Sequence, residues 1–189
     1  MCIRDRDLSD KIKQKYSKID VLLNNAGGAN KTKQITTEGL EKTFATNQMN
    51  YFVLSTELLE IISESNDGRI VNVASNAHIG AEVDYENINS EKSFSAWTSY
   101  CVSKLMNIMF TYQLSSIQDK VSVNVLHPGF VDTNIAGNEG NFIKYIVKLG
   151  AKMFARTVDS GADSSIYLST SDEVQNVSCL LYTSPSPRD

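Results

Sequence analysis

Three short runs of mainly apolar, often β-branched residues lie far apart in this chain, and the stretches between them have the spacing of helices. The runs occupy residues 19–23, 69–75 and 121–126. Runs of this kind are typical of fully buried strands. Strands that alternate with long helices pair in parallel, because a parallel connection needs a long crossover, and that crossover is almost always right-handed. The sequence therefore predicts an α/β fold built on a parallel sheet.

The longest helix-like stretch follows the first of these runs. Thr36 or Thr37 can cap its start, and Asn-Asp-Gly at 66–68 closes it. One face of this predicted helix is marked by residues that follow one another at three- and four-residue steps: Leu40, Phe44, Asn47, Tyr51, Leu54, Leu58 and Ile62. Other stretches predict the tail of a helix at 7–18, whole helices at 95–118, 139–154 and 158–170, and a polar connection at 76–94.

Size and composition limit the possible functions. A chain of 189 residues with 41% hydrophobic and 21% charged residues fits one globular domain. Its net charge of −4 offers no basic surface for nucleic acid. No apolar run approaches the roughly 20 residues that span a bilayer. With three cysteines, no disulfide framework is implied, and a reducing, cytoplasmic environment is expected.

The two ends depart from the pattern between them. Residues 1–6 and 179–189 show no helical or strand period, and both resemble translated sequencing-adapter read-through. We therefore expect them to be non-native tails flanking a domain at 7–178. A natural disordered tail is the alternative. Cys101 is then the cysteine that belongs to the domain, and we expect it to serve packing.

Polar motifs stand where the predicted strands end. Asn24-Asn-Ala-Gly27 follows the first strand, Ser75 ends the second, and His127-Pro-Gly129 follows the third. Tyr100 and Lys104 lie one turn apart on the next helix. Because the carboxyl ends of parallel strands form one edge, where open α/β sheets bind ligands, we expect these residues to gather at one site.

Tyr100 and Lys104 form a candidate acid/base pair. A free phenol has a pKa near 10, which is high for proton exchange at neutral pH. An ammonium one turn away favours the phenolate, so we expect Lys104 to lower the pKa of Tyr100. The Ser75 hydroxyl can donate to a substrate carbonyl oxygen. The alternatives are an exposed tyrosine beside a solvated lysine, and a serine that caps the next turn.

Asn47 lies inside a predicted helix, where asparagine has poor propensity. Phe44 and Tyr51 share its face, which favours a buried amide with hydrogen-bond partners over a surface asparagine. His78 and His127 are far apart in the sequence and have no Cys or carboxylate companions at ligand spacing, so no metal site is expected.

With these motifs in this order, residues 7–178 resemble the short-chain dehydrogenase/reductase superfamily, and within it the retinol-dehydrogenase-type members. The resemblance includes Asn89-Ser-Glu-Lys92 and the long connection between Ser75 and Tyr100. It implies a Rossmann-type, doubly wound parallel sheet. It also implies an NAD(P)-dependent oxidoreductase that interconverts an alcohol and an aldehyde or ketone, with NADP slightly favoured.

The resemblance assigns roles to particular residues. Tyr100 is the general acid/base, Lys104 also holds the cofactor ribose, Ser75 binds the substrate oxygen, and Asn47 anchors a proton-relay water. The cofactor-binding residues would be Asn24, Ala26, Gly27, Pro128, Gly129 and Thr133, together with Tyr100 and Lys104. Asn24 would also tie the central sheet together.

The family's Thr-Gly-x-x-x-Gly-x-Gly turn and its Gly-Lys-Tyr-Phe sequence are absent. We therefore expect an internal fragment, truncated in the N-terminal half of the fold, from which an N-terminal membrane anchor could have been lost. Two alternatives to an enzyme follow: an inactive truncated fragment, and a dinucleotide-binding module without turnover.

Further expectations concern partners. Residues 139–154 would form a lid over a small lipophilic substrate, with Phe142, Ile146, Leu149 and Met153 on one face. A homodimer would pair through the helices at 37–65 and 95–118.

Overall fold

The computed structural model describes residues 2–129 and 158–183, and within them a single four-stranded sheet. All of its neighbouring strands are parallel, in the order β1 (Val21–Asn24), β2 (Arg69–Val73), β3 (Ser122–His127) and β4 (Leu181–Thr183). The three strands expected from the apolar runs are confirmed. The proposed lid at 139–154 lies outside the described residues.

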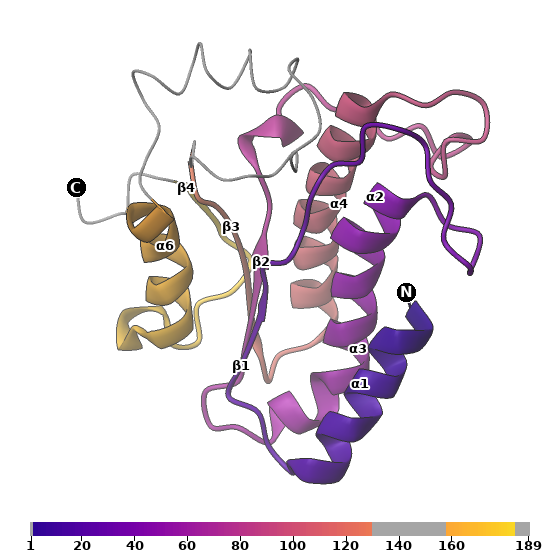
Figure 1. Ribbon diagram of the computed structural model, residues 1–189. Coiled ribbons are helices and arrows are strands. Elements are labelled where there is room, and N and C mark those ends of the chain that lie inside the picture. Colours follow the sequence, from indigo (N-terminus) through magenta and orange to yellow (C-terminus); the bar gives the residue numbers. More distant parts are fainter. Residues whose placement is uncertain (1, 130–157, 184–189) are drawn as a thin grey trace.

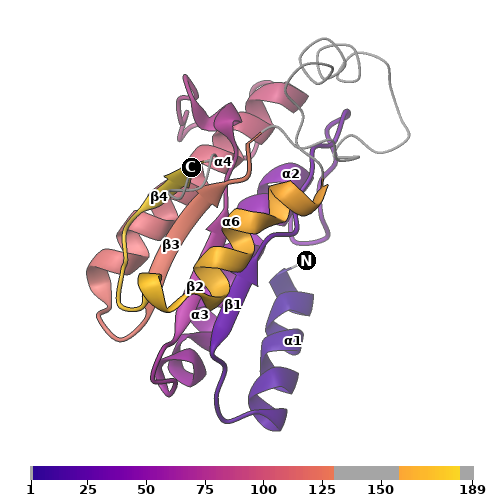
Figure 2. The ribbon, with the colours of Figure 1, turned by 90° about the vertical axis from the view of Figure 1, so that its left-hand side faces the viewer.

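Helices cover both faces of the sheet (Figures 1 and 2). On one face lie α3 (Asn50–Ser63) and α4 (Ala96–Ile117), with α1 (Cys2–Lys15) packed against α3. On the other face lies α6 (Val158–Thr170). The doubly wound, Rossmann-like architecture is thus confirmed. No helix in the described ranges is both long and apolar enough to cross a membrane.

Strand β2 shows how the sequence divides the core. Every residue of β2 is buried, and alternate side chains point to opposite faces. Ile70 packs with Leu58, Ile62 and Leu114 beneath α3 and α4. Val71 and Val73 pack on the α6 face with Leu126, Leu168 and Val174. Two apolar layers therefore fix the helices to the sheet.

A polar layer lies between the sheet and the helices α3 and α4. The Asn24 amide donates to Asn72 Oδ1 at 2.8 Å and to Ser55 Oγ at 3.0 Å. Asn72 in turn donates to Thr111 Oγ1 at 2.9 Å. These four side chains are buried and join β1, β2, α3 and α4. The expectation that Asn24 ties the sheet together agrees with this geometry.

The start of the long helix differs from the prediction. It begins at Lys42, with α2 (Lys42–Phe44), a π-helical turn η1 (Ala45–Met49) and then α3 in succession. The cap is Glu41, whose carboxylate accepts from the amides of Thr43 and Phe44, both at 2.9 Å. Caps at Thr36 or Thr37 were wrong, because Gly39 has a φ of +81° and turns the chain before the helix begins.

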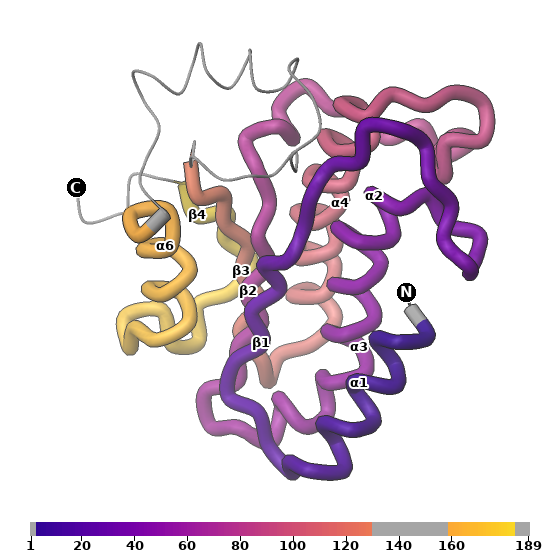
Figure 3. Tube along the Cα trace, viewed as in Figure 1, coloured from indigo at the N-terminus to yellow at the C-terminus, as the bar shows by residue number. Residues whose placement is uncertain are grey.

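Figure 3 follows the chain from β1 across the end of the sheet to α2, beside the connection between β2 and α4. Hydrogen bonds join these two connections: Lys33 Nζ donates to the Ser90 carbonyl at 2.6 Å, and Asn89 Nδ2 to the Gly39 carbonyl at 2.9 Å. The polar connection predicted at 76–94 has one short helix, η2 (Asn76–His78). The predicted helices at 95–118 and 158–170 are confirmed as α4 and α6.

Both chain ends contain regular structure that the sequence pattern did not predict. Residues from Cys2 onward belong to α1, and Arg6 pairs with Glu57 of α3 at 3.6 Å. Leu181–Thr183 forms β4, because the edge of β3 presents free backbone groups that an extended segment can pair with. Such backbone pairing does not depend on side-chain pattern. The non-native origin of the two ends remains a prediction.

Arg69 at the start of β2 provides a test of this architecture. Its buried guanidinium donates to the carbonyls of Leu168 at 3.1 Å and Ser171 at 2.9 Å, and pairs with Asp67. We expect Arg69→Met to lower the free energy of unfolding by about 2–4 kcal/mol, because α6 loses its polar anchor on the sheet. Urea denaturation measures this loss.

The matched control is Lys92→Met, which removes the exposed Lys92–Glu86 ion pair and should change stability by less than about 0.5 kcal/mol. Equal stability of the two variants would contradict the anchoring role of Arg69.

Candidate active site

Ser75 follows β2 at the carboxyl edge of the sheet. Its extended backbone, with φ −159° and ψ 153°, turns the chain into η2, and its Oγ accepts from the Ala77 amide at 3.2 Å. The same hydroxyl hydrogen-bonds the Tyr100 side chain. The capping role and the contact with Tyr100 thus coexist, and the serine is held at the strand end where the sequence placed it.

Tyr100 and Lys104 lie on the inner side of α4, and both are buried, with 9% and 4% of their surfaces exposed. Lys104 Nζ donates to the Val73 carbonyl at 2.9 Å, which fixes α4 to the end of β2. It lies 5.9 Å from the centroid of the Tyr100 ring. The exposed tyrosine and solvated lysine of the alternative interpretation are therefore excluded.

Burial controls the protonation of this pair. It lowers the pKa of Lys104 to about 8, because the ammonium is removed from water. It also raises the pKa of Tyr100, and the hydrogen bond from Ser75 offsets part of that rise. The prediction that Lys104 would lower the pKa of Tyr100 was wrong in this structure, since desolvation of the phenolate dominates.

Asn47 lies in the π-helical turn η1 and is fully buried. Its Nδ2 donates to the Gly28 carbonyl and to Ser103 Oγ, both at 2.9 Å, and its Oδ1 accepts from the Gly28 amide at 2.9 Å. The buried amide expected from the sequence is thus found with a full set of partners. It ties the turn after β1 to α4, next to Lys104.

The turn after β1 approaches the site through Gly27. A Cβ at this position would lie 3.1 Å from Asn47 Oδ1 and 3.3 Å from Lys104 Nζ, so any larger residue would have to displace these two side chains by a few tenths of an ångström. Ala26 and Gly27 are exposed, whereas the Asn24 side chain points into the polar layer below. The turn therefore offers backbone and small side chains, and not the Asn24 amide, to a ligand.

The turn after β3 is described as far as Gly129. Gly129 has a φ of +77°, and its amide donates to His127 Nδ1 at 3.4 Å. Burial and the nearby His78 lower the pKa of His127. Pro128 is half-buried, and Thr133 lies outside the described residues. In the described ranges, no group of three or more His, Cys, Asp or Glu side chains could hold a metal.

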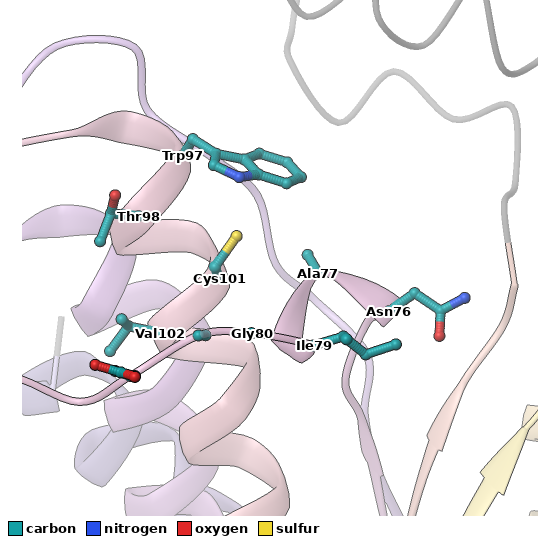
Figure 4. A pocket seen from close by; sticks show the side chains of 10 residues that line it. Asn76, Ala77, Ile79, Gly80, Trp97, Thr98, Cys101 and Val102 are labelled. Atoms are coloured by element: carbon teal, nitrogen blue, oxygen red, sulfur yellow. The ribbon is translucent and has the colours of Figure 1, made fainter.

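A cavity of about 380 Å³ lies between the segment that follows Ser75 and the first turns of α4 (Figure 4). Ala77 and Ile79 line it from the segment after β2, and Trp97, Cys101 and Val102 line it from α4. Its wall is mixed, with apolar side chains beside the Asn76 amide and the Glu82 carboxylate. Burial raises the pKa of Cys101, which favours a packing role over a nucleophilic one.

Sequence reasoning missed several residues of the site. Ser103 holds Asn47 and donates to the Tyr100 carbonyl at 2.7 Å, and Asn107 donates to the Val73 carbonyl at 3.3 Å. Tyr51 lies against Lys104, with its ring centroid 5.8 Å from Nζ. Spacing could have indicated all three, because each lies one turn or less along its helix from Asn47 or Lys104.

Comparison with known families and proteins gives a consistent result. A family model described as short chain dehydrogenase matches residues 5–143. Human retinol dehydrogenase 14 is 37% identical over 169 residues, which cover 87% of this chain and 50% of that protein. Human polyprenol dehydrogenase is 31% identical over 180 residues, which cover 91% of this chain and 54% of that protein. The chain therefore spans about half the length of the curated relatives it matches.

Solved structures match the fold. A crystal structure of a Mycobacterium Paratuberculosis protein has a TM-score of 0.72 at 26% identity, covering 97% of this chain and 59% of that one. A gluconate 5-dehydrogenase from Burkholderia cenocepacia J2315, solved in complex with NADP and tartrate, has a TM-score of 0.70 at 17% identity, covering 97% and 69%. At that identity the second likeness concerns the fold alone.

The depressed pKa of Lys104 predicts a pH dependence of stability. A folded pKa of about 8, against 10.5 for the free side chain, means that the unfolded chain binds more protons between these values. Stability should therefore rise as the pH increases from about 8, by up to roughly 3 kcal/mol. Because unfolded tyrosines ionise near 10, the comparison is best made between pH 7.5 and 9.5.

Lys104→Met should remove this rise. Urea denaturation of both proteins at pH 7.5, 8.5 and 9.5 measures the difference, and parallel pH profiles would contradict a buried, proton-shedding lysine.

Proposed function

The chain belongs to the short chain dehydrogenase family, and on this basis we propose that it carries the catalytic residues of an NAD(P)-dependent oxidoreductase that interconverts an alcohol and an aldehyde or ketone. One observation carries the proposal. Ser75, Tyr100 and Lys104 meet at the carboxyl edge of a parallel sheet. That edge is where open α/β sheets bind their ligands.

The residues at this edge fit a nicotinamide dinucleotide. Gly27 supplies a turn without a side chain, and a Cβ there would crowd Asn47 and Lys104. The Lys104 ammonium can donate to ribose hydroxyls, while Pro128, Gly129 and Thr133 would border the nicotinamide. When bound, the nicotinamide supplies hydride-transfer chemistry. We favour NADP, in keeping with the family and with fold relatives that were solved in complex with it.

The chain's own residues would handle the proton. Tyr100 donates its phenolic proton to the substrate oxygen during reduction and takes it back during oxidation. The Ser75 hydroxyl, already hydrogen-bonded to Tyr100, holds that same oxygen and stabilises the charge that develops on it. The Lys104 ammonium, 5.9 Å from the Tyr100 ring, would offset part of the cost that burial imposes on the phenolate. Asn47 keeps the turn at Gly28 against α4, and would anchor the relay water.

The substrate would be small and lipophilic. Ile79, Trp97 and Val102 give the cavity apolar walls, and the Trp97 ring lies 6.2 Å from that of Tyr100. Retinol dehydrogenases and a polyprenol dehydrogenase are among the relatives, and their names denote lipophilic alcohols. A homodimer through α3 and α4 is part of the same proposal, because Phe52, Met109 and Tyr112 leave apolar surface exposed on these helices.

Trp97 provides the first test. It is 61% exposed and its ring lies 6.2 Å from that of Tyr100, so a dinucleotide at the site should change its fluorescence. We expect saturable binding of NADPH, followed by reduction of lipophilic aldehydes. Binding without turnover would favour the dinucleotide-binding module, and no binding by the folded chain would favour the inactive truncated fragment; either outcome would contradict the proposal.

Tyr100→Phe tests the proton-transfer role. The substitution should lower kcat by about 10²–10⁴-fold while NADPH affinity stays within a few-fold, because a positioned acid/base acts on the chemical step. Tyr85→Phe, at a tyrosine that is 71% exposed, is the matched control and should keep full activity. Steady-state kinetics and the fluorescence titration give both quantities. Equal activity of the two variants would refute the assignment of Tyr100.

A further inference from the structure

Lys104 is a buried cation with an unusual set of neighbours. Its Nζ donates to the Val73 carbonyl at 2.9 Å, lies near the turn at Gly27, and is 5.8 and 5.9 Å from the centroids of two tyrosine rings. Burial lowers its pKa, and no carboxylate or second ammonium of the described residues contributes to that shift. The protonated form therefore has no counter-ion among these residues.

Tyr51 is the less expected of the two rings. It lies on α3 one helical turn after Asn47, is 1% exposed, and its ring centroid lies 5.8 Å from Lys104 Nζ. The Tyr100 centroid, on α4, lies 5.9 Å from the same nitrogen. Both distances fall within the range of about 6 Å in which an aromatic face attracts an ammonium. Two helices thus each contribute one ring to a single buried charge.

The Tyr51 hydroxyl does not explain why this residue is buried. Its oxygen has no hydrogen-bond partner among the described residues, and an unpartnered buried hydroxyl destabilises a fold. Burial, and to a smaller extent the Tyr100 phenol, raise the pKa of Tyr51, so it stays neutral and does not compete as an acid or base. We therefore assign the interaction with Lys104 to the aromatic ring of Tyr51 and not to its hydroxyl.

We propose that Tyr51 is a positioning residue for Lys104, whose ring face holds the ammonium between the end of β2 and Tyr100. The titratable groups that face the ammonium are the phenols of Tyr51 on α3 and Tyr100 on α4. From the other packed elements come uncharged groups: the Val73 carbonyl of β2, the Gly27 turn and, from η1, the Asn47 amide. The catalytic consequence of this arrangement rests on the function proposed above.

Two roles of the Tyr51 ring can be told apart: attraction of the Lys104 ammonium, and simple exclusion of water from it. If the ring stabilises the ammonium, its removal lowers the pKa of Lys104. If Tyr51 only excludes water, its truncation admits water and raises that pKa. The direction of the shift therefore separates the two roles, and no cofactor or substrate is needed to measure it.

The experiment is a carbon-13 NMR titration of lysine-labelled full chain, with the Lys104 signal assigned by its loss in Lys104→Met. We expect Tyr51→Leu and Tyr51→Met to lower the pKa of Lys104 by about half a unit or more, as the loss of a desolvated cation–π contact implies. Tyr51→Phe, which keeps the ring, should leave it within about 0.3 units. The matched control is Phe52→Leu, because the Phe52 ring packs on Phe110; this variant should not change the pKa of Lys104.

An unchanged or raised pKa of Lys104 in the Leu or Met variant overturns the proposal. An equal fall in Tyr51→Phe also overturns it, because the hydroxyl would then carry the effect. If the Leu variant does not fold, the flexible Met side chain and the Phe variant still decide the question. If the pKa of Lys104 shifts as expected but the chain does not bind NADPH, the result counts against the proposed function and not against the role of Tyr51.

Discussion

The hydrogen bond from Lys104 to the Val73 carbonyl, at 2.9 Å, joins the long helix α4 to the end of β2 and places a charge at the edge of the sheet. The arrangement of the site depends on it. Once this nitrogen is fixed, Tyr100 one turn earlier lies beside Ser75. A Cβ at Gly27 would lie only 3.3 Å from Nζ, so a glycine fits this position best. A buried ammonium is costly, and the fold supports it with a carbonyl and two aromatic rings.

Beneath this charge the interior is layered. Near the site, amides and hydroxyls fill the space between sheet and helices, from Asn47 and Ser103 down to Asn24, Asn72 and Thr111. Farther from the site the same space is apolar, with Leu58, Ile62 and Ile70 in contact. The polar layer has directional bonds that fix helix position, and the apolar layer supplies the driving force for packing. The ends of α3 and α4 near the site thus fix the geometry, and the ends farther from the site contribute most of the stability.

The sequence predicted the fold well because burial on both sides of a parallel strand leaves an apolar run that stands out, as at 69–75. It also placed Ser75, Tyr100 and Lys104 together, since strand ends and helix turns have fixed periods. Local structure was harder to predict from the sequence. The Glu41 cap, the π-helical turn around Asn47 and the strand at Leu181–Thr183 depend on hydrogen bonds that leave little trace in composition. The pKa of Tyr100 was missed in direction because burial of a phenol depends on the packing around it.

The central claim is that this edge of the sheet supports hydride exchange with a carbonyl. The most direct measurement uses NADPH deuterated at C4 of the nicotinamide, incubated with the chain and a lipophilic aldehyde, and mass spectrometry of the alcohol formed. The account predicts one deuterium on the carbinol carbon, transferred from one of the two C4 positions. Saturable NADPH binding with no deuterated alcohol from any lipophilic aldehyde would contradict it.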